Sequence, residues 1–391
     1  MESAWITLIW LLPIAAGISW WLGRRSVRVS ETDNLRSIHP EYFKGLNYVL
    51  NEQPDKAIEV FIKMLEVDSE TVETHLALGN LFRRRGEVDR AIRIHQNLIA
   101  RPTLNREQRA LALLELGMDY MRSGLLDRAE GLFKELVETG SHSVQAFSQL
   151  LDIYQQEKDW ENAINIARKL EFASGETLNA VIAQFYCEKA EELRLSGHEK
   201  GAKENLRKAL SIDPFCVRAS LIEAEELYEN GKFKQALAVY QRVESQDSEY
   251  LSEAVKPMLN CYRNLDKVDE YMQYLQVIVD KYGGITSMLM LAELIAEQEG
   301  EDAAARFITS ELKKRPTVRG VNRLIEYALA QAQGGARENL ISIKDLTGKL
   351  LENRSVYKCR QCGFDAKSLH WQCPSCKNWS TVKPVHGVEG E

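Results

Sequence analysis

The chain has 391 residues, of which 45% are hydrophobic and 27% charged, and this length predicts two or three domains or one extended repeat array. With 23 glycines and 9 prolines, collagen-like, all-β and low-complexity chains are disfavoured. The formal net charge of −7 disfavours a non-specific nucleic-acid binder, which is usually basic.

Residues 1–23 predict a transmembrane helix that anchors the chain. No charged residue occurs from Ser3 to Gly23, and about 20 helical residues span the hydrocarbon core of a bilayer. Trp5, Trp20 and Trp21 lie near the two ends of this stretch, where interfacial aromatic belts form. A cleaved signal peptide fits less well, because its basic residues precede a shorter apolar run.

Residues 24–37 are predicted to form a basic juxtamembrane linker. Arg24, Arg25 and Arg28 follow the apolar stretch, whereas only Glu2 precedes it. The positive-inside rule therefore places the bulk of the chain in the cytoplasm.

Residues 38–352 carry an internal repeat. A small residue recurs at steps of 34, 38, 34, 39 and 34 residues, at Ala57, Ala91, Ala129, Ala163, Ala202 and Ala236. Twelve residues upstream of each lies a position that is mostly small, namely Gly45, Gly79, Gly117, Leu151, Ala190 and Ala224. Four residues downstream lies a position that is mostly large, namely Phe61, His95, Phe133, Ala167, Leu206 and Tyr240.

This pattern resembles the tetratricopeptide repeat (TPR), in which a small residue lets two antiparallel helices approach closely. About six repeats are clear, and continuing the step predicts two or three degenerate units near Met258, Ala292 and Glu326. The steps of 38 and 39 residues predict insertions in the loops between repeats. Turns between paired helices are expected at Gly86, Gly124, Gly197 and Gly231.

The predicted fold class is all-α, a TPR superhelical solenoid preceded by one transmembrane helix and followed by a small four-cysteine domain. The cysteines of that domain are Cys359, Cys362, Cys373 and Cys376, and their spacing resembles that of rubredoxin-like and zinc-ribbon domains. The concave groove of such a solenoid binds peptides or partner proteins. We find no GxGxxG, P-loop, HExxH or GxSxG pattern, so the sequence predicts a scaffold and not an enzyme. The run from Arg83 to Arg85 is interpreted as a solvated helix C-terminus.

Residues 353–391 contain the motif Cys359-x2-Cys362-x10-Cys373-x2-Cys376. Two CxxC turns supply four thiolates in the tetrahedral arrangement that suits one Zn or Fe ion. Two disulfides fit less well in a reducing compartment. Because a segment of about 35 residues is too short to fold on its own core, metal binding and folding are expected to be coupled.

The aromatic residues Tyr357, Phe364, Trp371 and Trp379 are expected to form a small core around this site. The predicted last helix runs almost without a linker into Tyr357, which indicates that the four-cysteine domain docks on the array. The remaining cysteines are expected to be isolated, buried packing residues: Cys187, Cys216 and Cys261. A rubredoxin-like electron carrier and a membrane-tethered nucleic-acid-binding zinc ribbon remain alternatives.

The order of anchor, repeats and knuckle resembles the bacterial lipopolysaccharide assembly protein B family over the whole chain. The residues that carry this resemblance are the Trp-rich anchor ending in Gly23-Arg24-Arg25, the repeats, and the four-cysteine motif with Gly363 and Pro374. The resemblance implies a single-pass protein of the cell inner membrane with a periplasmic N-terminus and a rubredoxin-like metal site on Cys359, Cys362, Cys373 and Cys376.

The resemblance also implies a function. It predicts a non-catalytic adaptor that regulates lipopolysaccharide biosynthesis by presenting the lipid A pathway deacetylase to the membrane AAA+ protease FtsH. Other lipopolysaccharide synthesis and transport proteins are further expected partners, together with the inner-membrane bilayer. Nucleic acid is a disfavoured partner, and pairing of the membrane helix leaves a homodimer open.

Overall fold

The computed structural model of the chain describes residues 40–67, 72–352, 354–388 and 390. Contacts divide these residues into two compact units, one ending at Glu157 and the other beginning at Lys158. The predicted anchor at 1–23 and the linker at 24–37 lie outside the described residues. Within the described part, no helix combines the length and the hydrophobicity needed to span a membrane.

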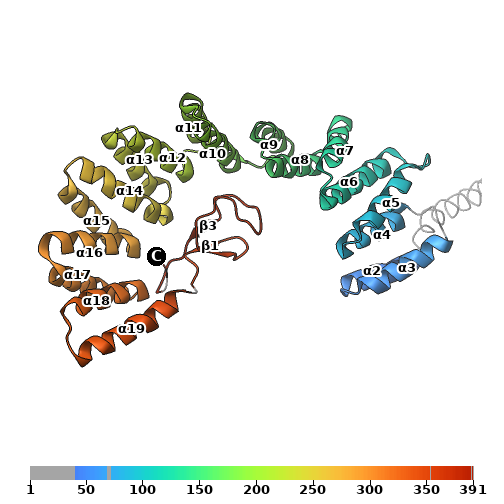
Figure 1. The fold of residues 1–391 in the computed structure, drawn as a ribbon. Helices are drawn as coiled ribbons and strands as arrows, with labels where there is room; N and C mark the ends of the chain where they lie inside the picture. The colour runs from blue at the N-terminus through green and yellow to red at the C-terminus, as the bar shows by residue number, and fades with distance from the viewer. Residues whose placement is uncertain (1–39, 68–71, 353, 389, 391) are drawn as a thin grey trace, which may run out of the picture. The chain divides into compact units, whose positions relative to one another are not determined.

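The first unit consists of α-helices joined by short turns. Its elements are α2 (Pro40–Leu50), α3 (Pro54–Val67), α4 (Val72–Arg85), α5 (Val88–Ile99), α6 (Arg106–Ser123), α7 (Leu126–Thr139) and α8 (Ser143–Glu157). The pairs α2/α3, α4/α5 and α6/α7 each form a hairpin of helices (Figure 1).

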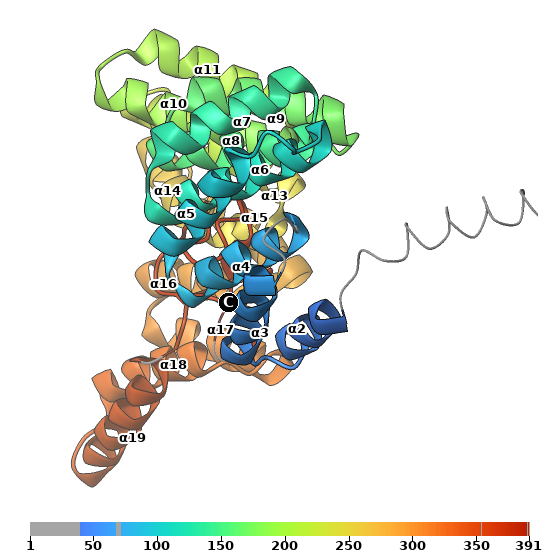
Figure 2. The same cartoon turned by 90° about the vertical axis from the view of Figure 1, so that its right-hand side faces the viewer.

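The second unit continues with helical hairpins. Its helices are α9 (Trp160–Ser174), α10 (Asn179–Leu195), α11 (Glu199–Ile212), α12 (Val217–Glu229), α13 (Phe233–Gln246), the 3-10 turn η1 (Ser248–Tyr250), α14 (Leu251–Asn264), α15 (Val268–Tyr282), α16 (Ile285–Glu299), α17 (Glu301–Lys314), α18 (Val318–Gln331) and α19 (Gly335–Glu352). Helices pair in chain order from α10/α11 to α18/α19, and Figure 2 shows α18 and α19 side by side at the end of this series.

The repeat positions pack as the sequence predicts. A methyl group added to Gly45 would lie 2.6 Å from the Phe61 ring, and one added to Gly117 would lie 2.5 Å from Phe133. The small residue of the first helix therefore makes room for the large residue of the second. The alanines that define the repeat are all fully buried: Ala57, Ala91, Ala129, Ala163, Ala202 and Ala236.

The degenerate repeats are helical hairpins as well. Helices α14 to α19 form three pairs, and Met258, Ala292 and Ile308 are fully buried in them. The all-α TPR fold class is confirmed. Backbone φ angles are positive at the predicted turn glycines, which are Gly86, Gly124, Gly197 and Gly231.

The insertions between repeats do not lie mainly in loops, so that expectation was wrong. Helices α6 and α10 have 18 and 17 residues, and each begins about one turn earlier than the repeat pattern requires. In α6 the early start is fixed by Asn105, whose side chain accepts a hydrogen bond from the N–H of Gln108 while the Gln108 side chain accepts one in return. In α10 the added turn buries Ile182.

Arg83 is not a solvated helix end, which corrects the interpretation given above. Its guanidinium lies 2.7 Å from Asp119 and 2.6 Å from Glu115 on α6. The same Asp119 carboxylate contacts Nδ1 of His95 at 2.6 Å, and both of those side chains are fully buried. His95 thus replaces the phenylalanine of other repeats with a residue that needs a charged partner.

The chain after α19 forms a small sheet of three antiparallel strands in the order β2-β1-β3. They are β1 (Tyr357–Cys359), β2 (Asp365–Ala366) and β3 (Val382–Pro384). Cys359 pairs with Val382, and Tyr357 pairs with both Ala366 and Pro384. We call residues 354–388 the ribbon. Figure 1 shows it on the inner side of the arc of helices in the second unit.

Candidate metal centre

Two backbone turns of the same form hold the four cysteines. In the first, the N–H of Gly363 donates to the carbonyl of Cys359 at 3.0 Å, and in the second Lys377 donates to Cys373 at 2.9 Å. The N–H of Cys359 also donates to the carbonyl of Phe364, as that of Cys373 does to Asn378. The two CxxC turns are therefore equivalent knuckles that direct two sulfurs each toward one point.

The four sulfur atoms lie within 4.8 Å of one another. The Sγ atoms of Cys359 and Cys376 are 3.8 Å apart, and those of Cys362 and Cys373 are 3.7 Å apart. A metal–sulfur bond of about 2.3 Å gives a tetrahedron with an edge of about 3.8 Å, so the thiols fit a single ion. A disulfide requires about 2.05 Å between the sulfurs, so the four thiols are not joined by disulfides in this structure.

The surroundings of the thiols differ. Burial raises the pKa of Cys359, but its hydrogen bond with the Thr381 hydroxyl and the one donated by the backbone N–H of Cys362 outweigh burial and bring that pKa to about 6. Burial raises the pKa of Cys373 to about 11. A metal ion would displace the remaining protons, so binding releases protons and strengthens as the pH rises.

The aromatic residues of the ribbon have two distinct roles. Tyr357 and Phe364 pack around the cysteines, as the sequence predicts. Trp379 instead contacts the array edge-on, with ring centroids 5.8 Å from Phe185 and 6.3 Å from Trp160. Trp371 lies 5.4 Å from the ring of Tyr250. The expectation that all four would form the ribbon's own core was therefore wrong for the two tryptophans.

Polar contacts complete the docking of the ribbon on the second unit. The hydroxyl of Tyr250 donates to the carbonyl of Val382 at 3.2 Å. Lys383 pairs with Asp247 at 2.8 Å and with Glu249 at 2.6 Å, and Arg360 also pairs with Glu249. The prediction that the ribbon docks on the array is confirmed.

Arg218 is a buried cation beneath this interface. Its guanidinium pairs with Glu188 at 2.9 Å and with Glu191 at 2.8 Å, and it lies 6.0 Å from the Trp371 ring. Because a buried charge is costly without partners, two carboxylates and one aromatic face fix the position of this side chain. No local motif marks Arg218, and sequence reasoning missed it.

The other cysteines are buried, as expected, but Cys187 and Cys216 are not isolated. Their sulfur atoms lie 3.8 Å apart, although the residues belong to different helical hairpins. Only Cys261 remains without a cysteine neighbour among the described residues.

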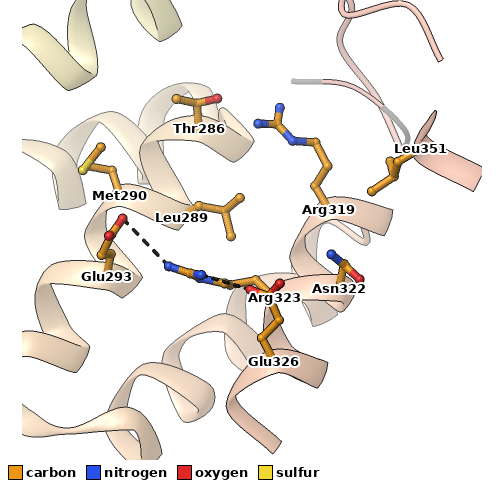
Figure 3. Close-up of a pocket in the computed structure, with 9 residues that line it drawn as sticks. All are labelled: Thr286, Leu289, Met290, Glu293, Arg319, Asn322, Arg323, Glu326 and Leu351. Carbon is orange, nitrogen blue, oxygen red and sulfur yellow. Dashed lines mark hydrogen bonds and ion pairs between the residues drawn. The ribbon is translucent and has the colours of Figure 1, made fainter. Parts of the chain in front are cut away.

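A separate hollow of about 370 Å³ lies on the second unit, between α16, α18 and the end of α19 (Figure 3). Arg323 extends across it and pairs with Glu326 at 3.0 Å and with Glu293 at 3.9 Å. In the lining of this hollow, the positive charges of Arg319 and Arg323 are balanced by Glu293 and Glu326, and the apolar part is formed by Leu289, Met290 and Leu351.

Among the described residues, the four ribbon cysteines are the one group of His, Cys, Asp and Glu side chains arranged to hold a metal.

Comparisons with known families agree with this architecture. The family described as "Rubredoxin metal binding domain" matches residues 357–384. Tetratricopeptide repeat families match residues 74–110 and 183–216, and the PPR repeat matches residues 119–141. A solved structure of the C-terminal part of a TPR protein from Cytophaga hutchinsonii is 14% identical, with a TM-score of 0.42, over 64% of this chain and 99% of that one.

Curated relatives match this chain along its whole length. Lipopolysaccharide assembly protein B of Escherichia coli (strain K12) is 41% identical and covers 98% of this chain and 99% of that protein. The protein of the same name from Haemophilus influenzae is 38% identical, with 98% of each chain covered. The helical hairpins, the rubredoxin-like four-cysteine site and this similarity lead to one conclusion: the chain belongs to the lipopolysaccharide assembly protein B family.

Proposed function

We propose that the chain is a non-catalytic adaptor in lipopolysaccharide biosynthesis. The observation that carries this proposal is the closed set of four cysteine ligands at the metal site. Structural metal sites are saturated by protein ligands, whereas catalytic sites keep a position open for water or substrate. The metal thus folds the ribbon, and the ribbon adds a fixed element to the helical array.

The proposed partners are the lipid A pathway deacetylase and the membrane protease FtsH. TPR arrays bind other proteins, and the relatives' name concerns lipopolysaccharide assembly. With residues 1–23 as a single-pass anchor in the inner membrane, the array stays beside a membrane-bound protease. A deacetylase held on the same tether then meets the protease at an effective concentration of roughly millimolar.

The test compares the intact chain with two altered chains, each expressed in cells that lack the native gene. The chain without residues 1–23 is expected to fold but not to lower the amount of deacetylase. A chain with an unrelated single-pass helix of the same orientation in place of residues 1–23 is expected to restore regulation. Full regulation by the soluble form would contradict the tethering proposal, and cross-linking of the native chain followed by mass spectrometry identifies its partners.

The metal proposed for the site is one zinc or iron ion with a structural role. Metal analysis of the natively expressed chain distinguishes the two. Zinc alone supports the structural role. A red iron centre that is reduced and reoxidised reversibly would favour the rubredoxin-like electron carrier instead, because a redox ion can exchange electrons through the exposed ligand Cys362.

A further inference from the structure

Two thiols from different helical hairpins meet inside the second unit. Cys187 lies within α10, and Cys216 directly precedes α12. Their Sγ atoms are 3.8 Å apart, and the residues are 0% and 2% exposed. The sulfurs must approach by about 1.7 Å to form a disulfide. Cys216 is the N-cap residue of α12 and has an extended backbone. Its movement toward Cys187 would disturb only the terminal hydrogen bond of that helix, in which the N–H of Ser220 donates to the Cys216 carbonyl at 3.4 Å.

The thiol pair lies beside the docking site of the ribbon. The amide of Gln184 donates to the sulfur of Cys216 at 3.6 Å and also to the hydroxyl of Ser380 in the ribbon at 3.0 Å. Gln184 itself is 2% exposed. One buried side chain therefore joins the thiol pair to the ribbon, and a reagent has no open path to the sulfurs while these contacts hold.

We propose that Cys187 and Cys216 form a dithiol oxidation site whose substrate is a low-molecular-weight disulfide, and that the docked ribbon shields this site. The state of the thiols then records whether the ribbon is docked. This inference does not depend on the proposed adaptor function, since it concerns only contacts within the second unit.

The reaction is a thiol–disulfide exchange in two steps. The thiolate of Cys216 attacks one sulfur of oxidised glutathione, which forms a mixed disulfide and releases one glutathione thiolate. The thiol of Cys187 then loses its proton to that thiolate and attacks the sulfur of Cys216, and the second glutathione leaves as a thiolate that takes a proton from water. The two protein thiols are oxidised, and one glutathione disulfide is reduced to two glutathione molecules.

The environments of the sulfurs suit this order. A hydrogen bond from Cys187 lowers the pKa of Cys216, which also stands at the N-terminus of α12. Burial raises the pKa of Cys187. Thiolates at helix N-termini are the more reactive nucleophiles. Cys216 is therefore the attacking residue, and Cys187 is the resolving one.

The experiment uses the full-length, metal-loaded chain in detergent. The chain is incubated with oxidised glutathione, the free thiols are blocked with N-ethylmaleimide, and the cysteine peptides are mapped by mass spectrometry. We expect a Cys187–Cys216 cross-linked peptide, while Cys261, which is also fully buried, stays reduced. The proposal is contradicted if Cys187 and Cys216 carry only N-ethylmaleimide or glutathione, and no cross-linked peptide forms, both in the native chain and in the Trp379→Ala variant described next.

The shielding is tested with Trp379→Ala, which removes the contacts with Trp160 and Phe185 but no metal ligand. We expect the cross-link to form about tenfold faster, the change in open population expected from the loss of two aromatic pairs. Phe172→Ala, at a residue 95% exposed, is the matched control and should leave the rate unchanged. Metal content and circular dichroism verify folding. If Trp379→Ala changes the metal content or the circular dichroism, Tyr250→Phe is used in its place. An unchanged rate of cross-linking in the variant that folds contradicts the shielding by the ribbon.

Discussion

Gly363 and Lys377 occupy equivalent positions in the two metal knuckles, and both have left-handed backbones, with φ angles of 77° and 60°. In each knuckle the residue follows a ligand cysteine and donates its N–H to the first cysteine of the pair. Glycine adopts this conformation without strain, whereas lysine does not. The second knuckle is therefore the strained one.

Lys377→Gly is expected to stabilise the metal-loaded ribbon by about 1 kcal/mol, because it removes this strain. The rate of metal transfer to a chelator should fall accordingly. Lys377→Ala is the control, since it removes the charge but keeps a side chain in the left-handed region, and it should give no gain. Gly363→Ala should accelerate metal loss. Equal rates of metal transfer for the three variants and the native chain would show that the left-handed backbone of Lys377 does not destabilise the ribbon.

Cys359→Ser or Cys373→Ser is expected to remove the metal and unfold the ribbon while the helices remain. The ribbon has too small a core to fold without the ion. Metal content should fall, and far-ultraviolet circular dichroism should stay close to that of the native chain. Cys261→Ala is the control for loss of a buried thiol, because Cys261 lies on α14 away from the cysteine ligands. Full metal content in either serine variant would refute the ligand assignment.

Much of this architecture could be predicted from local sequence patterns. The spacing of Gly45, Ala57 and Phe61 fixes a hairpin because these residues meet within one repeat. The four ligand cysteines likewise lie within a short stretch. The contacts between Tyr250 and Val382 or between Gln184 and Ser380 join residues 132 and 196 positions apart. No periodicity marks such pairs, so the ribbon's partners and the Cys187–Cys216 pair appear only in the folded chain.

Tyr250→Phe is expected to weaken docking of the ribbon by about 1 kcal/mol, because the buried carbonyl of Val382 loses its side-chain donor. Hydrogen exchange of residues 371–384 should become faster, while exchange in α18 and α19 should not change. Tyr282→Phe, at a partly exposed tyrosine of α15, is the matched control. Unchanged exchange in the ribbon would mean that this hydrogen bond does not contribute to docking.

Glu249→Gln should weaken docking by less than about 1 kcal/mol, since the ion pairs with Lys383 and Arg360 are partly exposed. In the native chain, hydrogen exchange of the ribbon should become faster as the salt concentration rises, because salt screens these ion pairs. In Glu249→Gln the exchange rate should change less with salt. Glu204→Gln removes a carboxylate that pairs with Lys208 on its own helix. It should retain the native salt dependence, and an identical loss in both variants would argue against a specific role of Glu249.

His95→Phe is expected to destabilise the first unit by about 1–3 kcal/mol, although phenylalanine occupies this position in two other repeats. The substitution leaves Oδ2 of the fully buried Asp119 carboxylate without its histidine partner, while Oδ1 keeps its pair with Arg83. The double substitution His95→Phe with Asp119→Leu should recover part of the loss, because no buried carboxylate oxygen is then left without a partner and Arg83 keeps its pair with Glu115. Chemical denaturation measures both, and additive effects of the two substitutions would show that the residues do not act as a pair.

The docking of Trp371 and Trp379 has a consequence for any shortened form of the protein. A chain cut after α19 does not become a simpler TPR protein, because Phe185, Trp160 and Tyr250 then lose the rings that cover them. Exposed aromatic patches of this kind promote aggregation and capture by proteolytic quality control. Truncation and loss of the ion should therefore both produce an aggregation-prone polypeptide that is degraded quickly. The half-life of the chain in cells should then depend on how much metal the cell supplies.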